Sequence, residues 1–317
     1  MNEDPFAVQA DVRGPWRTYL DALTPLRPEL HRYCTRLTGN VWDGEDLAQD
    51  ALAKVFSMLG KIDADLQNPR AYLIRTATNL WIDRVRRLAR ERETLQLEAA
   101  SAPTAVGAEG VDGTGAAGAL FQALHPQERA AIVLKEALDL SLEESAQVLR
   151  TSVGAVKAAL SRARGRLSQA RPAAGFAAPP RELVQKFMVA LRDTDLEGLK
   201  ALCSADLAIE LVGGAQSDSF ESGSSFFAHA HFVFPALGFG ENPWWELAEY
   251  EGEPIVVGYR TLDGVEGINE IHRLDVEDGK IARVRCYCFA PDTLRWVAAE
   301  LGKVALDRRY RSPDPRR

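Results

Sequence analysis

The chemistry that this sequence offers most plainly is the binding of phosphate, because two separate stretches concentrate arginine and lysine. Residues 70–92 contain seven arginines against two acidic residues, and residues 150–171 contain six basic residues and no acidic one. Guanidinium and ammonium groups form charge-assisted hydrogen bonds with phosphate oxygens, so basic helix faces are typical of nucleic-acid binding. One charged run alone more often covers a solvated helix face, but two separated basic helices in one chain favour a DNA partner.

A third group of side chains carries the opposite charge. Over residues 43–59 the apolar residues Leu47, Ala51 and Val55 recur at helical spacing, and Asp43 is predicted to cap this helix. The side of the helix opposite these apolar residues carries an acidic stripe made of Glu45, Asp46, Gln49 and Asp50. Such a stripe suits a basic surface on another protein, where charge complementarity sets encounter rate and register.

Histidine and cysteine offer a weaker indication of metal binding. His229 and His231 share one side of an extended segment, as do Cys286 and Cys288, so four ligands suited to zinc could converge. The chain lacks the CxxC spacing of a compact zinc site, and the alternative is that the cysteines line a strand and the histidines sit in an aromatic loop. No acid–base constellation for catalysis is evident either. We therefore predict no catalytic residue, no metal site and no cofactor.

Two linkers divide the chain into the elements that must position these side chains. The chain has 317 residues, a net charge of −7 and 46% hydrophobic residues, which suits two or three globular domains. Residues 99–119 are small and Gly/Ala-rich, which predicts a flexible tether, and residues 171–181 form a shorter Pro/Ala joint. The expected domains are residues 25–98, 120–170 and 181–302, followed by a basic tail at 303–317.

Composition excludes several classes of protein. No run of 18 uncharged apolar residues is present, so we expect no membrane span, and the first residues do not have the pattern of a secretory signal. Four cysteines do not make a disulfide framework, which indicates a reducing cytoplasm. Residues 180–302 hold 21 acidic against 10 basic residues. The negative net charge of the whole chain therefore comes from its C-terminal part, although the two stretches upstream are basic.

The first domain is predicted to be entirely helical. Apolar residues between 26 and 37 recur at helical spacing and are followed by Gly39-Asn40, which is a helix stop. After the helix at 43–59, Pro69 is placed to begin a long helix through the arginine-rich stretch.

The second domain has the order of a helix-turn-helix. Pro126 begins a first helix, and Ser141 with Glu144 forms the capping box of a short second one. A turn at Arg150–Ser152 leads to the basic helix, which in a helix-turn-helix enters the major groove. Two amphipathic helices joined by a turn also build ordinary bundles, but every charge on this last helix is positive.

Three segments, in this order and at this separation, resemble the extracytoplasmic-function (group IV) class of bacterial sigma factors, the dissociable promoter-recognition subunits of RNA polymerase. DGEDLAQDALAKVF is similar to the family's polymerase-binding helix, and NPRAYLIRTATNLWIDRVRR to its −10-recognition region. SLEESAQVLRTSVGAVKAALSRARGRL is similar to its −35-binding helix-turn-helix. The resemblance covers about residues 25–98 and 120–170.

This resemblance implies three contact surfaces, of which the acidic stripe would bind core RNA polymerase. The loop before the arginine-rich helix would capture a flipped base, and that loop and helix would bind the −10 element through Asp63, Gln67, Asn68, Asn79, Arg84, Arg86 and Arg87. The helix-turn-helix would bind the −35 element through Ser152, Val153, Lys157, Ser161, Arg162 and Arg164. Where the family commonly reads VKSRLxRAR, this chain has Ala158 and Ala159, which predicts weaker or altered −35 binding.

The third domain is predicted to be α+β. Residues 182–203 give two amphipathic helices, and alternating strands follow, the last two joined by a hairpin at Asp278-Gly279. This order resembles the SnoaL-like group of the nuclear-transport-factor/ketosteroid-isomerase superfamily, which some group IV sigma factors carry as a built-in regulator. The predicted fold class is multidomain: two all-α sigma domains, a helical bundle and a helix-turn-helix, followed by an α+β cone-shaped SnoaL-like domain.

The predicted function is that of a cytoplasmic sigma factor, with core RNA polymerase and promoter DNA as partners. The C-terminal domain would modulate its activity through a small-molecule ligand or by docking within the chain. The alternative is a helix-turn-helix regulator whose C-terminal domain senses a small molecule; such a protein has no need of the acidic stripe. A SnoaL-type enzyme fused to a DNA-binding domain is disfavoured because no acid–base constellation is present.

Overall fold

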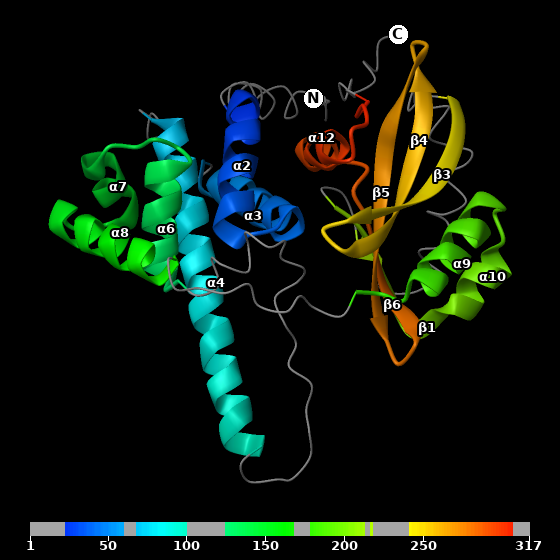
Figure 1. The fold of residues 1–317 in the computed structure, drawn as a ribbon, viewed down its shortest axis with the longest axis horizontal. Helices are drawn as coiled ribbons and strands as arrows, with labels where there is room; N and C mark the ends of the chain where they lie inside the picture. The colour runs from blue at the N-terminus through cyan, green and yellow to red at the C-terminus, as the bar shows by residue number, and fades with distance from the viewer. Residues whose placement is uncertain are drawn as a thin grey trace, which may run out of the picture. The chain divides into compact units, whose positions relative to one another are not determined.

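The computed structural model describes residues 23–59, 68–99, 124–167, 178–212, 216–217 and 241–306. The chain forms two compact units, Met1–Gly175 and Phe176–Arg317, and each has a hydrophobic core. The first unit is helical, and the second combines a sheet with helices (Figure 1). This arrangement confirms the predicted fold class, in which helical domains precede an α+β domain.

The described part of the N-terminal unit is built from helices alone. They are η1 (Thr24–Leu26), α2 (Arg27–Thr38), α3 (Val41–Leu59), α4 (Pro69–Ala99), α6 (Pro126–Glu136), α7 (Leu142–Leu149) and α8 (Val153–Leu167). Helices α4 and α6 both begin at a proline, as predicted, because the fixed φ of proline suits the first helical turn.

The corner between α2 and α3 is made by two adjacent residues. Gly39 ends α2 with φ at 94°, in the left-handed region that glycine adopts without steric penalty. Asn40 then begins α3, because its Oδ1 accepts a hydrogen bond from the amide of Asp43 at 2.7 Å. The prediction that Asp43 caps this helix is wrong, since α3 already starts at Val41 and the Asp43 carboxylate accepts from Asn40 Nδ2 at 2.8 Å.

One hydrophobic core runs through both helical segments of the N-terminal unit. The guanidinium of Arg129 on α6 lies over the Trp81 ring of α4, 5.6 Å from the ring centroid, and Arg36 on α2 donates to the carbonyl oxygen of Ala137 at 3.2 Å. The sequence predicted two helical domains separated by a tether, nearly all of which falls outside the described residues. The two segments nevertheless share one interior, because α6 packs against the apolar faces of α2 and α4.

The C-terminal unit is an α+β domain with one mixed sheet. Its elements are α9 (Arg181–Arg192), α10 (Leu196–Leu202), β1 (Cys203–Leu211), β2 (Gln216–Ser217), β3 (Glu241–Tyr250), β4 (Glu253–Leu262), β5 (Val265–Glu277), β6 (Lys280–Cys286) and α12 (Pro291–Glu300). The strand order is β2-β1-β6-β5-β4-β3, and β1 with β6 is the parallel pair among antiparallel neighbours.

Helix α9 covers one face of this sheet. Phe187 and Leu191 of α9 belong to the same buried cluster as Val256 of β4 and Leu274 of β5. The predicted hairpin between β5 and β6 is confirmed: Asp278 and Gly279 have φ values of 49° and 74°, which gives the strand-joining turn its required twist. The helices-first order followed by a single sheet is the order predicted for this domain.

Strand β3 and helix α12 of this unit were not predicted from the sequence. The aromatic-rich segment before β3 obscured the alternation of this strand. Pro291 at the first turn and the buried Leu294, Val297 and Ala298 give α12 its amphipathic pattern. Within the described ranges, no helix combines the length and apolarity that crossing a membrane requires.

Candidate nucleic-acid interface

The arginine-rich part of α4 presents polar side chains to solvent. Asn79, Arg86 and Arg87 are exposed, and Arg84 is half-buried. Asn79 and Arg86 are seven residues apart, nearly two helical turns, so they share one face of the helix. Arg87 also contacts Glu91 at 3.7 Å, but both groups are exposed and such a pair leaves the arginine accessible. This face can follow a phosphate backbone.

The loop before α4 lies largely outside the described residues, and Asp63 and Gln67 lie there too. Asn68 is described, and its Oδ1 accepts a hydrogen bond from the Ala71 amide at 3.0 Å. This contact satisfies one of the free amides at the start of α4. Asn68, which was predicted to bind DNA, therefore also begins the helix that carries the arginines.

The helix-turn-helix is formed as the sequence predicted. Ser141 and Glu144 make the predicted capping box of α7, with hydrogen bonds of 2.8 and 3.1 Å between each side chain and the other's amide. Arg150 ends α7 in the left-handed region at φ 51°. Ser152 begins α8, because its Oγ accepts from the Ala155 amide at 3.2 Å.

Helix α8 exposes part of the predicted −35 surface. Lys157 and Ser161 are exposed and lie four residues apart, whereas Val153 is half-buried. From the sequence, Ala158 and Ala159 were predicted to replace two polar residues that contact DNA in the family. This is wrong for Ala159, which is 5% exposed and belongs to the core of the unit. Only Ala158 occupies an exposed position.

A buried carboxylate on α6 holds the basic end of α8. Arg162 Nε donates to Glu128 Oε1 at 3.0 Å, and Arg166 Nε lies 3.5 Å from Glu128 Oε2. Burial alone would raise the pKa of Glu128, but the hydrogen bond from Arg162, a backbone amide and the charge of Arg166 together lower it. Arg164 donates to Glu136 at 2.7 Å. Arg162 and Arg164, predicted as −35 contacts, therefore also attach α8 to α6.

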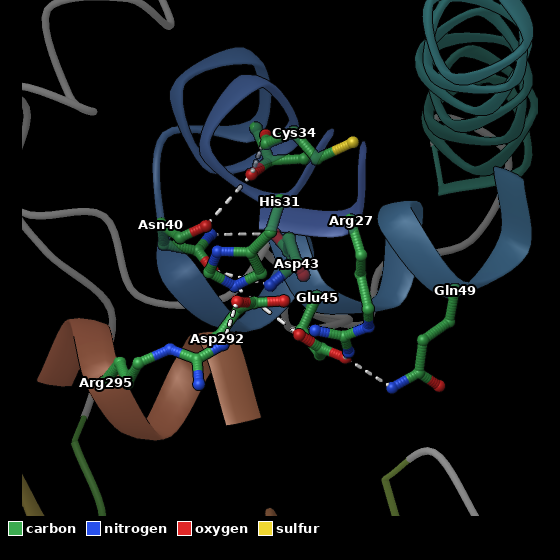
Figure 2. A network of polar contacts seen from close by, with 10 residues as sticks. Arg27, His31, Cys34, Asn40, Asp43, Glu45, Gln49, Asp292 and Arg295 are labelled. Carbon is green, nitrogen blue, oxygen red and sulfur yellow. Dashed lines mark hydrogen bonds and ion pairs between the residues drawn. The ribbon is translucent and has the colours of Figure 1, made fainter. Parts of the chain in front are cut away.

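The residues of the acidic stripe on α3 differ in what they contact: some face α2 and others face solvent. Figure 2 shows that the Glu45 carboxylate is approached by two residues of α2: Arg27 at 2.5 Å and His31 at 3.4 Å. Gln49 donates to Glu45 Oε1 at 2.7 Å. The prediction of Glu45 as an outward contact residue is therefore corrected: its charge binds α3 to α2. Asp50 is exposed and Asp46 half-buried, so these two carry the outward part of the stripe.

The geometry agrees with comparisons to known proteins. The Sigma-70 region 2 family matches residues 23–91, which contain α2, α3 and the basic part of α4, and Sigma-70 region 4 matches residues 115–167. The ECF RNA polymerase sigma factor SigJ of Mycobacterium tuberculosis is 31% identical over 283 residues, which cover 81% of this chain and 87% of SigJ. The chain belongs to the ECF sigma factor family.

The match of this ECF sigma factor to SigJ extends beyond the N-terminal unit into the C-terminal α+β unit, because it is longer than the 175 residues of the former. The crystal structure of SigJ aligns at 22% identity over 86% of this chain and 97% of that chain, with a TM-score of 0.34. An NTF2-like protein from Cytophaga hutchinsonii aligns at 13% identity over 35% of this chain and 91% of that chain, with a TM-score of 0.25.

The sigma factor also contains a polar cluster that was not predicted from the sequence. Cys286 was grouped with Cys288, His229 and His231, but both histidines lie outside the described residues. The structure instead places Cys286 beside Glu270 and His272 of β5. Glu270 and His272, at alternate positions of the segment GINEIH, were the available signal, since alternate residues of a strand share a face.

Proposed function

We propose that this ECF sigma factor binds core RNA polymerase through Asp46 and Asp50 and directs transcription initiation from specific promoters. The −10 element would bind along α4, and the −35 element would bind at the exposed part of α8. The observation that carries this proposal is the presence of both Sigma-70 regions in one chain, each with a basic helix exposed to solvent. A helix-turn-helix regulator would need only the second region, and the match over residues 23–91 favours the sigma factor.

The SnoaL-like unit would modulate this activity in the cytoplasm, where the polymerase acts. We propose regulation without catalysis, by a small-molecule ligand or by docking within the chain. Its strong acidic excess suits either a basic ligand or the basic helices of the N-terminal unit. The short joint at residues 171–181 would hold the two units at an effective concentration of about a millimolar, so even a weak contact between them would be populated.

Run-off transcription with purified core polymerase tests both parts of the proposal. The full chain should confer initiation from a specific promoter on core enzyme that has no sigma factor, and a repressor would not. Deleting residues 181–317 should change the run-off yield severalfold, whereas removing only the tail 303–317 should change it less. Equal yields from the full chain and the long truncation, across a range of salt, would show that the SnoaL-like unit does not modulate initiation.

Lys157→Ala should weaken −35 binding and reduce the salt slope by about one unit, because one phosphate contact is lost. Lys157 is exposed on α8, so its removal should leave the fold intact. Fluorescence anisotropy of a promoter duplex at several salt concentrations measures both quantities. Lys200→Ala, which removes the same charge from an exposed position of α10, is the matched control. Equal affinities and slopes for the two variants would show that α8 is not the DNA-binding helix.

A further inference from the structure

The SnoaL-like unit buries three potential metal ligands at the centre of its sheet. Glu270 and His272 lie two residues apart on β5, so their side chains share a face, and the β5–β6 register places Cys286 directly opposite His272. One ligand atom of each residue lies within 4.8 Å of those of the other two. All three side chains are buried, with at most 1% exposed surface.

The surrounding residues hold this cluster in place. Gly258 on β4 faces Glu270, and a Cβ at this position would lie 2.5 Å from Glu270 Cγ, so only glycine leaves room for the carboxylate. Trp245 Nε1 donates to Glu270 Oε1 at 2.8 Å. The Phe187 ring of α9 lies 6.1 Å from the His272 ring, measured between centroids. Contacts of this kind fix the orientation of metal ligands in proteins.

Several polar atoms of the cluster lack a hydrogen bond to any described residue. These are Glu270 Oε2 and both ring nitrogens of His272, although His272 Nε2 lies 3.4 Å from Glu270 Oε1. Buried polar atoms in native proteins nearly always have a partner, because an unpartnered one costs free energy. A carboxylate oxygen and an imidazole nitrogen that are both unpartnered, beside a cysteine sulfur, indicate a cation as the missing partner.

We infer that Glu270, His272 and Cys286 form a binding site for one zinc ion in the SnoaL-like unit. Imidazole, thiolate and carboxylate are all zinc ligands, and three protein ligands leave the fourth tetrahedral position open. Neighbouring ligand atoms of a tetrahedral zinc site lie roughly 3.3 to 3.8 Å apart, given Zn–S and Zn–N distances of about 2.3 and 2.0 Å. In the structure the three ligand atoms all lie within 4.8 Å of one another, and His272 Nε2 lies 3.4 Å from Glu270 Oε1.

The same residue types also build nucleophilic sites, but the surroundings of Cys286 oppose that use. Burial raises the pKa of Cys286, and the neighbouring Cys288 and Glu270 raise it further, whereas a nucleophilic cysteine needs a lowered pKa. A bound zinc ion would replace the thiol proton and stabilise the thiolate. Burial would raise the pKa of Glu270, but the contact with His272, and then the charge of Arg260 on β4, lower it, which favours the ionised form that binds a metal.

The ion would connect β5 to β6 and thus stabilise the sheet of the regulatory unit. Because the ligands are enclosed, zinc would be acquired as the domain folds, and chelation would act mainly on the unfolded protein. The inference concerns the C-terminal unit alone and does not depend on the promoter contacts proposed above.

The test uses the untagged full chain, produced with added zinc and purified without chelator. Elemental analysis should find close to one zinc per chain, and refolding with Co²⁺ should give the thiolate-to-cobalt charge-transfer absorption of a tetrahedral site. Cys286→Ser should abolish that absorption, and both Cys286→Ser and Glu270→Gln should weaken zinc binding at least tenfold. Cys203→Ser removes another buried cysteine of the same unit and should leave zinc binding unchanged.

Circular dichroism of each variant ensures that a loss of zinc is read only from folded protein. If a variant does not fold, the cobalt spectrum of the unsubstituted chain still decides the matter. Full-length protein that holds no zinc and shows no thiolate-to-cobalt absorption would overturn the inference. Folded Cys286→Ser protein that binds zinc as tightly as the unsubstituted chain would overturn it as well.

Discussion

Replacing Asp46 and Asp50 with lysine should lower the affinity of this ECF sigma factor for core RNA polymerase by at least about tenfold. Reversing two charges that face a basic partner removes two attractions and creates two repulsions, and like-charge contacts across an interface cost several kcal/mol. Exposed substitutions usually change stability by no more than about 0.5 kcal/mol, and Asp50 is exposed on α3. Binding is measured by titrating labelled sigma factor with core enzyme at fixed salt.

The matched control for this experiment is Glu143→Lys, which reverses the charge of an exposed acidic residue on α7. It should leave core binding close to that of the unsubstituted chain. Glu45 is unsuitable for the same test, because its carboxylate contacts Arg27 and its loss would loosen α3 from α2. Unchanged affinity of the folded double variant would refute the assignment of this α3 surface to the polymerase.

Glu128→Ala should lower the free energy of unfolding of the N-terminal unit by about 2 to 4 kcal/mol. The substitution removes the acidic member of the α6 capping box and leaves Arg162 and Arg166 without their buried partner. The estimate lies below that for a fully buried pair, because both arginines retain exposed surface and regain water. Chemical denaturation of the full chain, followed by tryptophan fluorescence, measures the change.

Glu144→Ala separates the two contributions of Glu128. Glu144 occupies the same capping-box position on α7 without a buried arginine partner, so its loss should lower the free energy of unfolding by clearly less than the loss of Glu128. Equal destabilisation by the two substitutions would mean that the arginine contacts of Glu128 add nothing to stability.

The effect of Glu128 should also depend on pH. The folded state lowers the pKa of this carboxyl below its ordinary value of 4.5, so its stabilisation is complete above that value. As the pH falls through the folded-state pKa, the carboxylate is protonated and the stabilisation is lost. The stability difference between the unsubstituted chain and Glu128→Ala should therefore shrink below about pH 4.5. A difference that stays constant at lower pH would contradict the ion pairing.

Local signals in the sequence determined most of the secondary structure and the order of the domains. Gly39 stops α2, Pro69 begins α4, Ser141 with Glu144 caps α7, and Asp278-Gly279 turns β5 into β6, all as predicted. Each of these features depends on backbone geometry or hydrogen bonds within a few residues. Such effects are encoded locally, and they were therefore readable without the fold.

The tertiary structure decided what the side chains of these elements meet. Glu45 lies on a helical face that reads as polar and exposed, yet Arg27, from 18 residues earlier in the chain, binds it. Ala159 reads as a lost DNA contact, yet it belongs to the core shared by both helical segments.

The cluster of Glu270, His272 and Cys286 likewise combines a feature encoded locally with one that only the tertiary structure determines. The alternation along β5 could be read from the sequence, but the partner of His272 could not. Only the β5–β6 register places Cys286 opposite it, and a shift of one residue would turn that side chain to the other face of the sheet. Contacts between residues distant in sequence depend on how whole elements pack, and no local pattern of residues specifies that packing.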